Sequence, residues 1–382
     1  MTVGAAPKGP VGVGLIGAGV ISAQYLSNLT TFPDLEVRFV ADIDLERAKS
    51  RAEEFGVAAS GTVEQLLADD GIDIVVNLTL PSMHAEVDLA ILAAGKHVWS
   101  EKPIATTAED ARRVLDAAAE AGLRVAVAPD TVLGAGLQTA FRAIADGRIG
   151  APQTAITQVL NPGPDRWHPA PEFLFQAGGG PLLDLGPYYL STLITVFGPV
   201  RRVSAVGSIA RPERTVESGP RAGTTFEVTV PTYSALLIEF EGGTSAQATF
   251  SFQSALPRAG SFEITGTDGV IVLPDPNVFD GESELWTVAS WTGVTGHDRP
   301  DPESIEAVGA STGRGLGVLE LARAIAAGVP ERASGALAAH VLDVMLAAAE
   351  ASETGTTVAV TSTVSAPEPL PAGWDPTERT LA

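Results

Sequence analysis

Residues 11–22 read VGVGLIGAGVIS, an apolar run that ends in a Gly-Ala-Gly turn and is followed by helical apolar spacing up to Leu29. A buried strand that enters a helix through such a turn is typical of a dinucleotide-binding βαβ unit. Gly17 would permit the tight turn, and Gly19 would let the backbone approach a pyrophosphate at the helix N-terminus. Ser22 stands where the fingerprint has its third glycine, and a side chain of this size still allows close packing.

An acidic residue follows the turn at the distance expected of a ribose-binding carboxylate. Asp42 ends the second apolar run, Val37–Ala41. A carboxylate there accepts the adenosine ribose hydroxyls of NAD and repels the 2′-phosphate of NADP. The next residues, Ile43 and Asp44, supply no arginine for a phosphate. The sequence therefore predicts NAD as the cofactor, with NADP the less favoured alternative.

The first 128 residues alternate short apolar runs with segments of helical spacing. The runs are nearly continuous in apolar character, as in parallel strands covered on both faces. Helix signals fall between them, including a capping-box pair at Thr62 and Gln65. This alternation predicts a doubly wound α/β domain of Rossmann type over residues 1–128. Its predicted strands are Val11–Ile16, Val37–Ala41, Ile74–Leu78, Val98–Ser100 and Val125–Ala128.

The pattern changes after Pro129, where longer segments alternate apolar and polar residues. Such alternation is typical of antiparallel strands with one covered face. It predicts an α+β domain over residues 129–362, closed by two helices, Val318–Ala327 and Ala336–Glu353. Residues 363–382 are rich in Pro, Thr and Glu, and we expect a loosely ordered tail. The predicted strands include Thr154–Val159, Val203–Ile209, Thr225–Val230, Ala235–Phe240 and Ala246–Phe252.

The 382-residue chain carries 24 Lys and Arg against 46 Asp and Glu, a net charge of −22, and it has no cysteine. The acidity leaves no basic stripe for nucleic acid or for an anionic membrane surface. The lack of cysteine excludes disulfides, thiol catalysis and Cys-ligated zinc. No run reaches the ~18 consecutive apolar residues of a membrane span, and no two histidines have metal-ligand spacing. We expect a cytoplasmic protein with no nucleic-acid partner, no membrane contact and no catalytic metal.

Three further segments carry polar residues that could take part in binding or catalysis. Residues 77–84 (NLTLPSMH) and 99–103 (WSEKP) follow predicted parallel strands, and ligands bind at the carboxyl ends of such strands. Residues 178–189 read GGGPLLDLGPYY. If a helix begins in this last segment, Asp184 and Tyr188 lie four residues apart on one face and can point into one pocket.

With these motifs, the sequence resembles the Gfo/Idh/MocA oxidoreductase family, in particular its glucose–fructose oxidoreductase and dihydrodiol dehydrogenase branch. Its most specific pieces are the Glu101-Lys102-Pro103 tripeptide and the stretch from Gly178 to Tyr188, together with the Gly17 turn. The resemblance covers Val11 to about Val360. It implies an N-terminal Rossmann domain and a C-terminal domain with a large, mostly antiparallel open sheet.

The resemblance also implies roles for residues at the strand ends. Lys102 matches the family's motif lysine, which contacts the substrate oxygen and the nicotinamide ribose. Glu101 matches the acid near the nicotinamide, and Pro103 the proline that shapes this loop. The implied cofactor contacts are Gly17, Gly19, Val20, Ile21, Asp42, Thr79, Pro81, His84, Glu101 and Lys102.

On the substrate side, Asp184 matches the family's acid, and Tyr188 stands where many members have histidine. Lys102, Tyr188 and Asp184 are thus the implied catalytic residues. A base must take the hydroxyl proton as hydride leaves the carbinol. Tyr188 is one candidate base, because a nearby ammonium such as that of Lys102 favours a phenolate. Lys102 itself, as a neutral amine, is the other.

The expected activity is NAD-dependent hydride transfer to or from a secondary alcohol of a sugar, glycoside or polyol. Two alternatives remain: a glycoside hydrolase or lyase that oxidises, eliminates and reduces again with the same NAD, and an inactive cofactor-binding regulator. Arg166, Trp167 and His168 form a polar loop that suits a sugar ring or is merely a loop. Because a one-faced sheet needs cover, we expect a homodimer or homotetramer through the C-terminal sheet.

Overall fold

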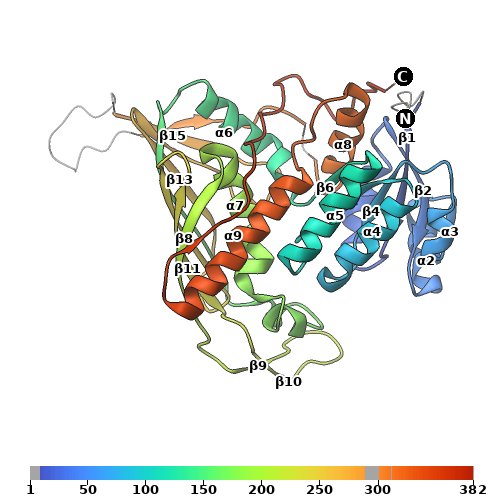
Figure 1. Ribbon diagram of the computed structural model, residues 1–382, viewed down its shortest axis with the longest axis horizontal. Coiled ribbons are helices and arrows are strands. Elements are labelled where there is room, and N and C mark those ends of the chain that lie inside the picture. Colours follow the sequence, from blue (N-terminus) through green and yellow to red (C-terminus); the bar gives the residue numbers. More distant parts are fainter. Residues whose placement is uncertain (1–8, 289–300, 311, 382) are drawn as a thin grey trace. The chain divides into compact units, whose positions relative to one another are not determined.

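The computed structural model describes residues 9–288, 301–310 and 312–381 of the chain. They form two compact units, each assembled from segments that are distant in the sequence (Figure 1). The first unit comprises Met1–Gly134, Gly309–Ala339 and Leu370–Ala382, and the second comprises Ala135–Val308 and His340–Pro369. This division is less simple than the predicted one at residue 128, because both units are discontinuous in sequence.

The first unit is built on a six-stranded sheet with the strand order β3-β2-β1-β4-β5-β6. All neighbouring pairs run parallel, and every residue of β1, β4 and β6 is buried. Continuous apolar strands are expected where helices cover both faces of a sheet. The strands span Val11–Ile16 (β1), Leu35–Ala41 (β2), Ala59–Gly61 (β3), Ile74–Asn77 (β4), His97–Ser100 (β5) and Val125–Val127 (β6).

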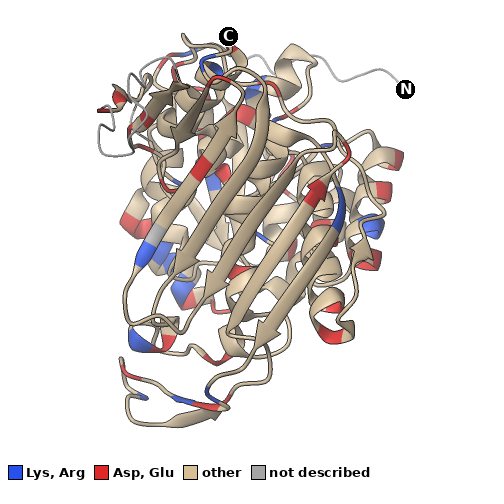
Figure 2. Ribbon diagram, turned by 90° about the vertical axis from the view of Figure 1, so that its left-hand side faces the viewer, with Lys and Arg blue, Asp and Glu red and all other residues tan. Residues whose placement is uncertain are grey.

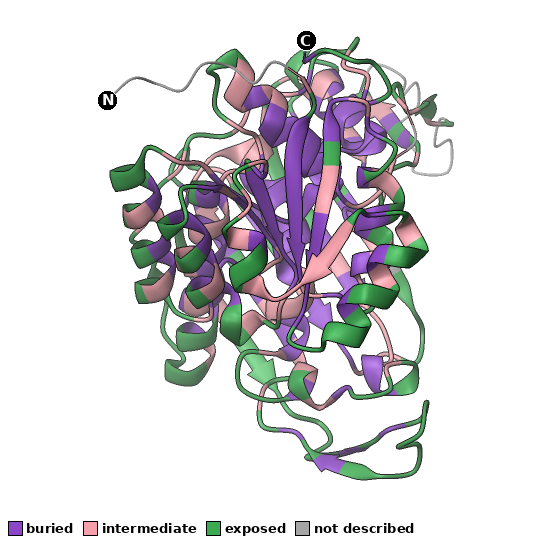
Figure 3. Cartoon of the chain, turned by 90° about the vertical axis from the view of Figure 1, so that its right-hand side faces the viewer, coloured by how far each residue is buried: buried purple, intermediate pink, exposed green. Residues whose placement is uncertain are grey.

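Helices cover both faces of this sheet, which Figure 3 shows as buried strands between helices with exposed outer surfaces. The chain steps from β1 to β2 in one direction and from β4 to β5 in the other. Right-handed crossovers therefore place α1 and α4 on opposite faces. Thr62 and Gln65 form the predicted capping box at the start of α3. The helices span Ser22–Leu29 (α1), Leu45–Phe55 (α2), Val63–Leu67 (α3), His84–Ala93 (α4) and Ala108–Ala121 (α5).

A helix from the far end of the sequence completes the first unit. α8 (Leu316–Ala327) packs against α1 and against β4, β5 and β6. The buried Asp130 fixes its start, since this carboxylate accepts hydrogen bonds from the backbone N–H groups of Gly315 (2.7 Å) and Gly317 (3.3 Å). The sequence predicted that this helix closes the second domain; in the structure its apolar face covers the parallel sheet instead.

The C-terminal segment is also held against the first unit. Asp34 is fully buried, and its carboxylate accepts hydrogen bonds from Arg323 on α8 and from the backbone N–H of Leu381, each 2.8 Å long. The Arg323 guanidinium lies over the ring of Trp374. Residues 363–382 were predicted to be loose, yet their described part is tied down, because a buried carboxylate needs hydrogen-bond donors and this segment supplies them.

The second unit is built on a nine-stranded sheet with the order β16-β15-β14-β13-β7-β12-β11-β8-β17. Neighbours run antiparallel except β7 and β12, which run parallel. The predicted fold class, a Rossmann domain joined to an α+β domain with a large, mostly antiparallel sheet, is therefore confirmed. The strands span Pro152–Leu160 (β7), Val200–Ser208 (β8), Tyr233–Phe240 (β11), Ser245–Ser251 (β12), Arg258–Gly266 (β13), Gly269–Val272 (β14), Ser283–Thr287 (β15), Glu303–Ile305 (β16) and Val358–Ala359 (β17).

One face of this sheet is covered by helix α7 (Gly180–Phe197), which packs against β7, β11 and β12. Tyr189 on this helix meets Phe250 of β12 edge to face, with 5.9 Å between the ring centroids. The residues that alternate with the buried ones point to the opposite face. Figure 2 shows few Lys, Arg, Asp and Glu residues along the central strands. The sheet is thus open on one side. Helix α6 (Ala135–Ala145) comes before the first strand of this sheet in the chain.

Helix α9 (Gly335–Thr354) runs from the first unit into the second. By length and composition alone it is the one helix among the described residues that could cross a membrane. However, 56% of its apolar window is buried inside the protein, as in a core helix. His340 within it is fully buried, and its Nε2 accepts a hydrogen bond from the backbone N–H of Val200 (2.9 Å).

Candidate active site

The strand order of the first unit reverses between β1 and β4, and open α/β sheets bind ligands at the carboxyl ends of the strands at such a point. The loops that leave β1, β2, β4 and β5 all meet at this edge. Every cofactor contact predicted from the sequence lies in one of these loops or at the first residue of the helix that follows it. The structure therefore gathers the ten predicted cofactor residues at one edge of one sheet.

The glycine turn after β1 has the backbone that its sequence predicts. Gly17 adopts φ +100°, and a Cβ there would lie 2.8 Å from the carbonyl oxygen of Leu78, so only glycine fits. A Cβ on Gly19 would meet no atom within 4 Å. Packing within the protein does not require glycine at this position, whereas close approach of a pyrophosphate does. Ser22 is buried and donates a hydrogen bond of 2.6 Å to the carbonyl of Gly19.

Asp42 is buried at the end of β2 and faces this turn. Its Oδ2 accepts the backbone N–H of Ala18 (2.7 Å), and its Oδ1 accepts that of Asp44 (2.9 Å). Arg47 at the start of α2 adds Nε to Oδ2 (3.2 Å) and Nη2 to Oδ1 (2.7 Å). Burial alone would raise the pKa of Asp42, but these hydrogen bonds hold the pKa below its usual value. The carboxylate is charged, and it carries an arginine partner that the sequence analysis missed.

Large apolar side chains are exposed at the same edge. The exposed fraction is 95% for Ile43, 84% for Val20 and 62% for Leu80, and Met83 is also exposed. Single exposed apolar residues are normal on protein surfaces, but several on adjacent loops indicate a binding surface. A flat heteroaromatic ring such as adenine would cover them, so these side chains fit a dinucleotide as well as Gly19 and Asp42 do.

A buried hydrogen-bond network shapes the loop after β4. Asn77 accepts hydrogen bonds from the N–H (3.1 Å) and hydroxyl (2.6 Å) of Thr79, and its amide donates to Asp88 (2.7 Å). His84 is buried, with Nδ1 2.6 Å from the carbonyl of Pro103 and Nε2 3.0 Å from that of Thr79. His84, which was expected to contact the cofactor, joins the loops after β4 and β5 because its two ring nitrogens meet these backbone carbonyls.

Glu101 is held at both carboxylate oxygens. Tyr25 on α1 donates a hydrogen bond of 2.9 Å to Oε1, and the backbone N–H of Lys102 donates one of 3.0 Å to Oε2. The Tyr25 oxygen itself accepts the indole N–H of Trp99 (3.2 Å). Burial, followed by the nearby charges of Glu101 and Asp130, raises the pKa of Tyr25 well above its usual value, so the phenol stays a donor. Lys102 and Glu101 are half-buried at the end of β5.

In the second unit, helix α7 begins at Gly180, the third glycine of the triplet, which meets the condition that a helix begins in this segment. Gly180 adopts φ +90°, and a Cβ on Gly179 would collide with the carbonyl oxygen of Phe173. Asp184 and Tyr188 therefore lie one turn apart on one helix face, Asp184 half-buried and Tyr188 buried. A carboxylate and a phenol share this face, as acid–base chemistry on a substrate hydroxyl requires.

The loop before this helix carries Arg166, Trp167 and His168. Trp167 is 68% exposed. His168 lies edge to face between Trp167 (centroids 5.6 Å apart) and Phe173 (5.5 Å apart), which makes a row of three rings. Arg166 pairs with Glu217 at 3.2 Å. Such a row of rings with a guanidinium beside it suits the apolar and polar faces of a sugar.

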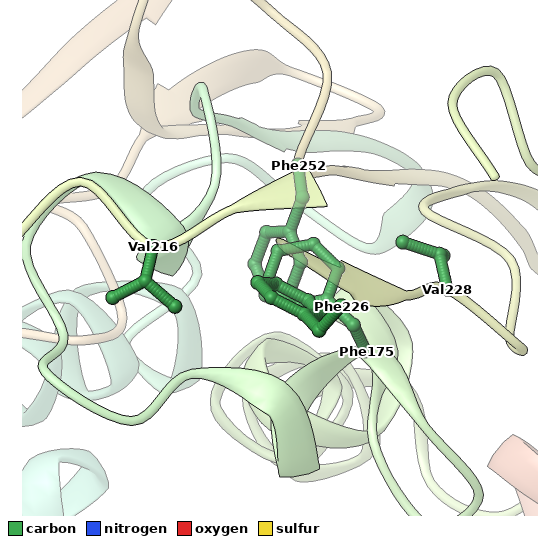
Figure 4. Close-up of a cluster of buried hydrophobic side chains, with 5 residues drawn as sticks. All are labelled: Phe175, Val216, Phe226, Val228 and Phe252. Atoms are coloured by element: carbon green, nitrogen blue, oxygen red, sulfur yellow. The ribbon is translucent and has the colours of Figure 1, made fainter. Parts of the chain in front are cut away.

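A small separate core holds this loop in place (Figure 4). The buried Arg214 pairs with Asp165 at 3.1 Å, donates to the carbonyl of Phe252 (2.6 Å), and lies over the ring of Phe175. Arg214 belongs to β9 (Glu213–Thr215), which pairs with β10 (Thr225–Glu227). The core side chains are Phe175, Val216, Phe226, Val228 and Phe252.

The described histidines bind nearby groups of the protein. His97 accepts the backbone N–H of Arg124 (2.9 Å) and His168 that of Ala170 (3.1 Å). His84 and His340 meet backbone groups as stated above. Within residues 9–288, 301–310 and 312–381, no three His, Asp or Glu side chains are grouped so that they could hold a metal ion.

Two family models match the chain. Residues 11–128 match "Oxidoreductase family, NAD-binding Rossmann fold", and residues 137–272 match "GFO/IDH/MocA C-terminal domain". The chain belongs to the Gfo/Idh/MocA family of oxidoreductases. The resemblance inferred from the motifs is confirmed, and the protein is an oxidoreductase with a Rossmann domain for a nicotinamide cofactor.

Relatives within the Gfo/Idh/MocA family act on sugars and related diols. The chain is 33% identical over 266 residues to 1,5-anhydro-D-fructose reductase from Ensifer adhaerens, covering 68% of this chain and 74% of the relative. It is 30% identical over 280 residues to trans-1,2-dihydrobenzene-1,2-diol dehydrogenase from Mus musculus, covering 70% and 78%. These names describe those proteins, and they agree with sugar or polyol oxidoreductase chemistry in general.

Solved structures in the family share the whole fold. A NAD-binding oxidoreductase from Klebsiella pneumoniae superposes with a TM-score of 0.81 at 23% identity, covering 92% of this chain and 100% of that one. Levoglucosan dehydrogenase in complex with NADH and L-sorbose gives a TM-score of 0.79 at 24% identity, covering 92% and 99%. At these identities the likeness shows the fold alone.

Proposed function

We propose that this protein is a NAD-dependent dehydrogenase acting on a secondary alcohol of a sugar, glycoside or polyol. The observation that carries the proposal is the meeting of Gly19, Asp42 and Glu101-Lys102 at one edge of the parallel sheet. The exposed apolar residues of the same edge, Ile43 and Leu80, support a bound adenosine. The similarity to curated sugar and diol oxidoreductases supports the substrate class.

The chain's own residues would hold the cofactor in three places. The α1 N-terminus and the open backbone at Gly19 would bind the pyrophosphate. Asp42 would accept the adenosine ribose hydroxyls, which favours NAD over NADP. Thr79, Pro81 and Lys102 would contact the nicotinamide half. When bound, NAD supplies the acceptor for the hydride.

We propose that Tyr188, Lys102 and Asp184 handle the substrate. As the carbinol C–H bond breaks and its electron pair leaves with the hydride, the hydroxyl proton passes to the phenolate oxygen of Tyr188 and a carbonyl forms. In this proposal Lys102 would donate a hydrogen bond to the same oxygen, and its positive charge would favour the phenolate. Asp184 would orient the lysine or a second substrate hydroxyl.

The loop of Arg166, Trp167 and His168 would bind the rest of the substrate. Trp167 offers an exposed ring face for the apolar side of a sugar. Arg166 and His168 offer hydrogen bonds to its hydroxyl groups. Phe173 extends this row of rings and was not singled out in the sequence.

The test is a panel of sugars, glycosides and polyols with NAD, followed by the absorbance of the reduced cofactor, with Lys102→Ala as the inactive control. A dehydrogenase forms reduced cofactor in step with product. An enzyme that recycles its NAD would cleave a glycoside without net reduction, and a regulator would bind NAD without turnover. Either of the last two outcomes would replace the proposal by that alternative.

We also propose that the open face of the nine-stranded sheet packs against a second copy of the chain, which gives a homodimer or homotetramer. The enzyme would be cytoplasmic. Leu237 and Ile156 are 60% and 53% exposed on this face and both lie opposite Gln247 in the strand register. Figure 2 shows how few charges the central strands carry. The face does carry charges, since Glu263 lies opposite Ile156 and Arg202 pairs with Glu239. A partly apolar face with few charges is typical of an interface.

A further inference from the structure

All hydrogen-bond acceptor positions of the Asp42 carboxylate are occupied. A carboxylate has about four lone-pair positions, and four donors fill them: the N–H groups of Ala18 and Asp44, and Nε and Nη2 of Arg47. Both hydroxyls of an adenosine ribose need acceptors on this same carboxylate. Two of the four donors must therefore give way when both ribose hydroxyls bind.

Arg47 is the donor that can move. The N–H groups of Ala18 and Asp44 are fixed in the backbone of the glycine turn and of the loop after β2. The Arg47 side chain is 48% exposed, whereas that of Asp42 is 5% exposed, so the guanidinium can turn into solvent and the carboxylate cannot. Only the arginine side of this ion pair is exposed, so its release leaves a buried carboxylate whose lost hydrogen bonds the ribose hydroxyls would replace.

We propose that Arg47 tunes the choice between NAD and NADP, an inference that rests on the cofactor site proposed above. Closed onto Asp42, Arg47 competes with the ribose hydroxyls of NAD. Turned away from Asp42, it meets a 2′-phosphate with a planar guanidinium that can bind two phosphate oxygens. Asp42 repels the phosphate and Arg47 attracts it, so the preference for NAD is smaller than Asp42 alone would give.

A second arginine strengthens the positive side of this balance. Arg51 lies one helical turn beyond Arg47 on α2, and its Nη2 is 3.4 Å from the carbonyl of Gly19. Its Nε is buried and has no hydrogen-bond partner among the described residues. Glu54 pairs with its other terminus at 2.7 Å. Two guanidinium groups on one helix face thus border the glycine turn.

The test measures binding rather than turnover. Isothermal titration calorimetry would compare adenosine 5′-monophosphate with adenosine 2′,5′-bisphosphate, which differ only in the 2′-phosphate, and then NAD with NADP. In Arg47→Met we expect the bisphosphate to bind about tenfold more weakly, equivalent to about 1.4 kcal/mol. We expect the monophosphate and NAD to bind up to about fivefold more tightly, because their competitor for Asp42 is gone.

Matched variants separate this role from a general loss of charge. Arg113→Met removes another arginine whose side chain is 48% exposed and paired with two carboxylates, those of Glu86 and Asp110 on α4 and α5, and we expect it to change neither ligand's affinity. Arg47→Lys keeps the charge but loses the planar guanidinium that can bind two oxygens. It should bind the bisphosphate more tightly than Arg47→Met and more weakly than the unaltered protein.

The outcomes distinguish this inference from the proposed function. If neither NAD nor adenosine 5′-monophosphate binds the unaltered protein, the cofactor site itself is wrong. If both bind and Arg47→Met leaves the ratio of bisphosphate to monophosphate affinity unchanged, or weakens both ligands equally, the role of Arg47 is overturned. A circular-dichroism melt of each variant would verify that the fold is retained.

Discussion

The phenol of Tyr25 donates a hydrogen bond of 2.9 Å to Glu101, 76 residues further along the chain. The bond joins the first helix after the glycine turn to the acid that precedes Lys102. Because the backbone N–H of Lys102 holds the other carboxylate oxygen, Glu101 has a single fixed orientation. A residue of helix α1 thereby orients the loop that carries Lys102.

Tyr25→Phe is expected to lower kcat by about tenfold, because a half-buried carboxylate loses its donor at a cost of about 1–3 kcal/mol. The Kd of NAD should change less, because the Gly17 turn and Asp42 are untouched. Tyr189→Phe removes a similar phenol–carboxylate bond, 2.8 Å to Asp275 in the second unit, and controls for lost stability. Equal losses of kcat in the two variants at equal melting temperatures would show that Tyr25 has no special role.

Asp42→Ser is expected to reverse the cofactor preference. The substitution removes the charge that repels a 2′-phosphate and frees Arg47 from its partner. The kcat/KM for NAD should fall and that for NADP should rise. The comparison is made with both cofactors in both proteins at one ionic strength, since phosphate binding depends on salt. Equal kcat/KM values for NAD and NADP in the unaltered protein would contradict the role given to Asp42.

Parts of the site could be predicted because their signal is local. The strand, the Gly17 turn and Asp42 lie within one βαβ unit, and the structure has them where the spacing predicts. Arg47 is also near, but it lies five residues beyond Asp42 on α2, and the sequence does not show that its side chain turns back to the carboxylate. Tyr25 could not be found in this way, since no spacing rule links it to Glu101.

Other parts depend on contacts that the sequence does not encode locally. α8 has the apolar spacing of any core helix, and only the hydrogen bonds of Asp130 and Asp34 show which sheet it covers. The tail beyond residue 363 has a loop composition, yet it supplies the donors for a buried carboxylate. Strands β14, β15 and β16 have only four, five and three residues, so their alternation is too short to be recognised, and the register of β13 is broken by two irregularities.

Asp88→Asn is expected to stabilise the protein above neutral pH. Burial raises the pKa of Asp88 to about 7, against a weaker opposing effect of the Asn77 hydrogen bond. Between about pH 4 and pH 7 the native state therefore binds more protons than the unfolded state, and stability falls as pH rises through this range. The asparagine has no such titration and still accepts the hydrogen bond from Asn77, whose donor atom is 2.7 Å from Asp88.

The measurement for Asp88 is urea unfolding of both proteins at pH 5 and pH 8. One pKa unit corresponds to about 1.4 kcal/mol, so the gain of the variant at pH 8 should be a few kcal/mol, on the order of 2–4. The gain at pH 5 should be smaller by about half or more. A difference that is the same at both pH values would mean that Asp88 does not titrate in this range.

Leu237→Lys combined with Ile156→Lys is expected to convert an assembly into monomers. The two charges would lie near the middle of the open sheet face, where burial against a second copy requires their desolvation. Size-exclusion chromatography with light scattering measures the mass. Val329→Lys, at an apolar position 45% exposed in the first unit, is the control and should leave the mass unchanged. A monomeric unaltered protein at working concentration would refute assembly through this face.

Tyr188→Phe is expected to lower kcat by at least about a hundredfold, the usual contribution of general acid–base catalysis, while the Kd of NAD stays the same. The change keeps the ring of this buried residue and removes only its hydroxyl, so the loss can be assigned to the proton. The rival assignment makes Lys102 the base and leaves Tyr188 to position the substrate. The two differ in the pH profile of kcat for alcohol oxidation, which should lose its rise with increasing pH in Tyr188→Phe only if the phenolate is the base. Near-normal kcat and an unchanged profile in Tyr188→Phe, with Lys102→Ala inactive, would assign the proton to the lysine.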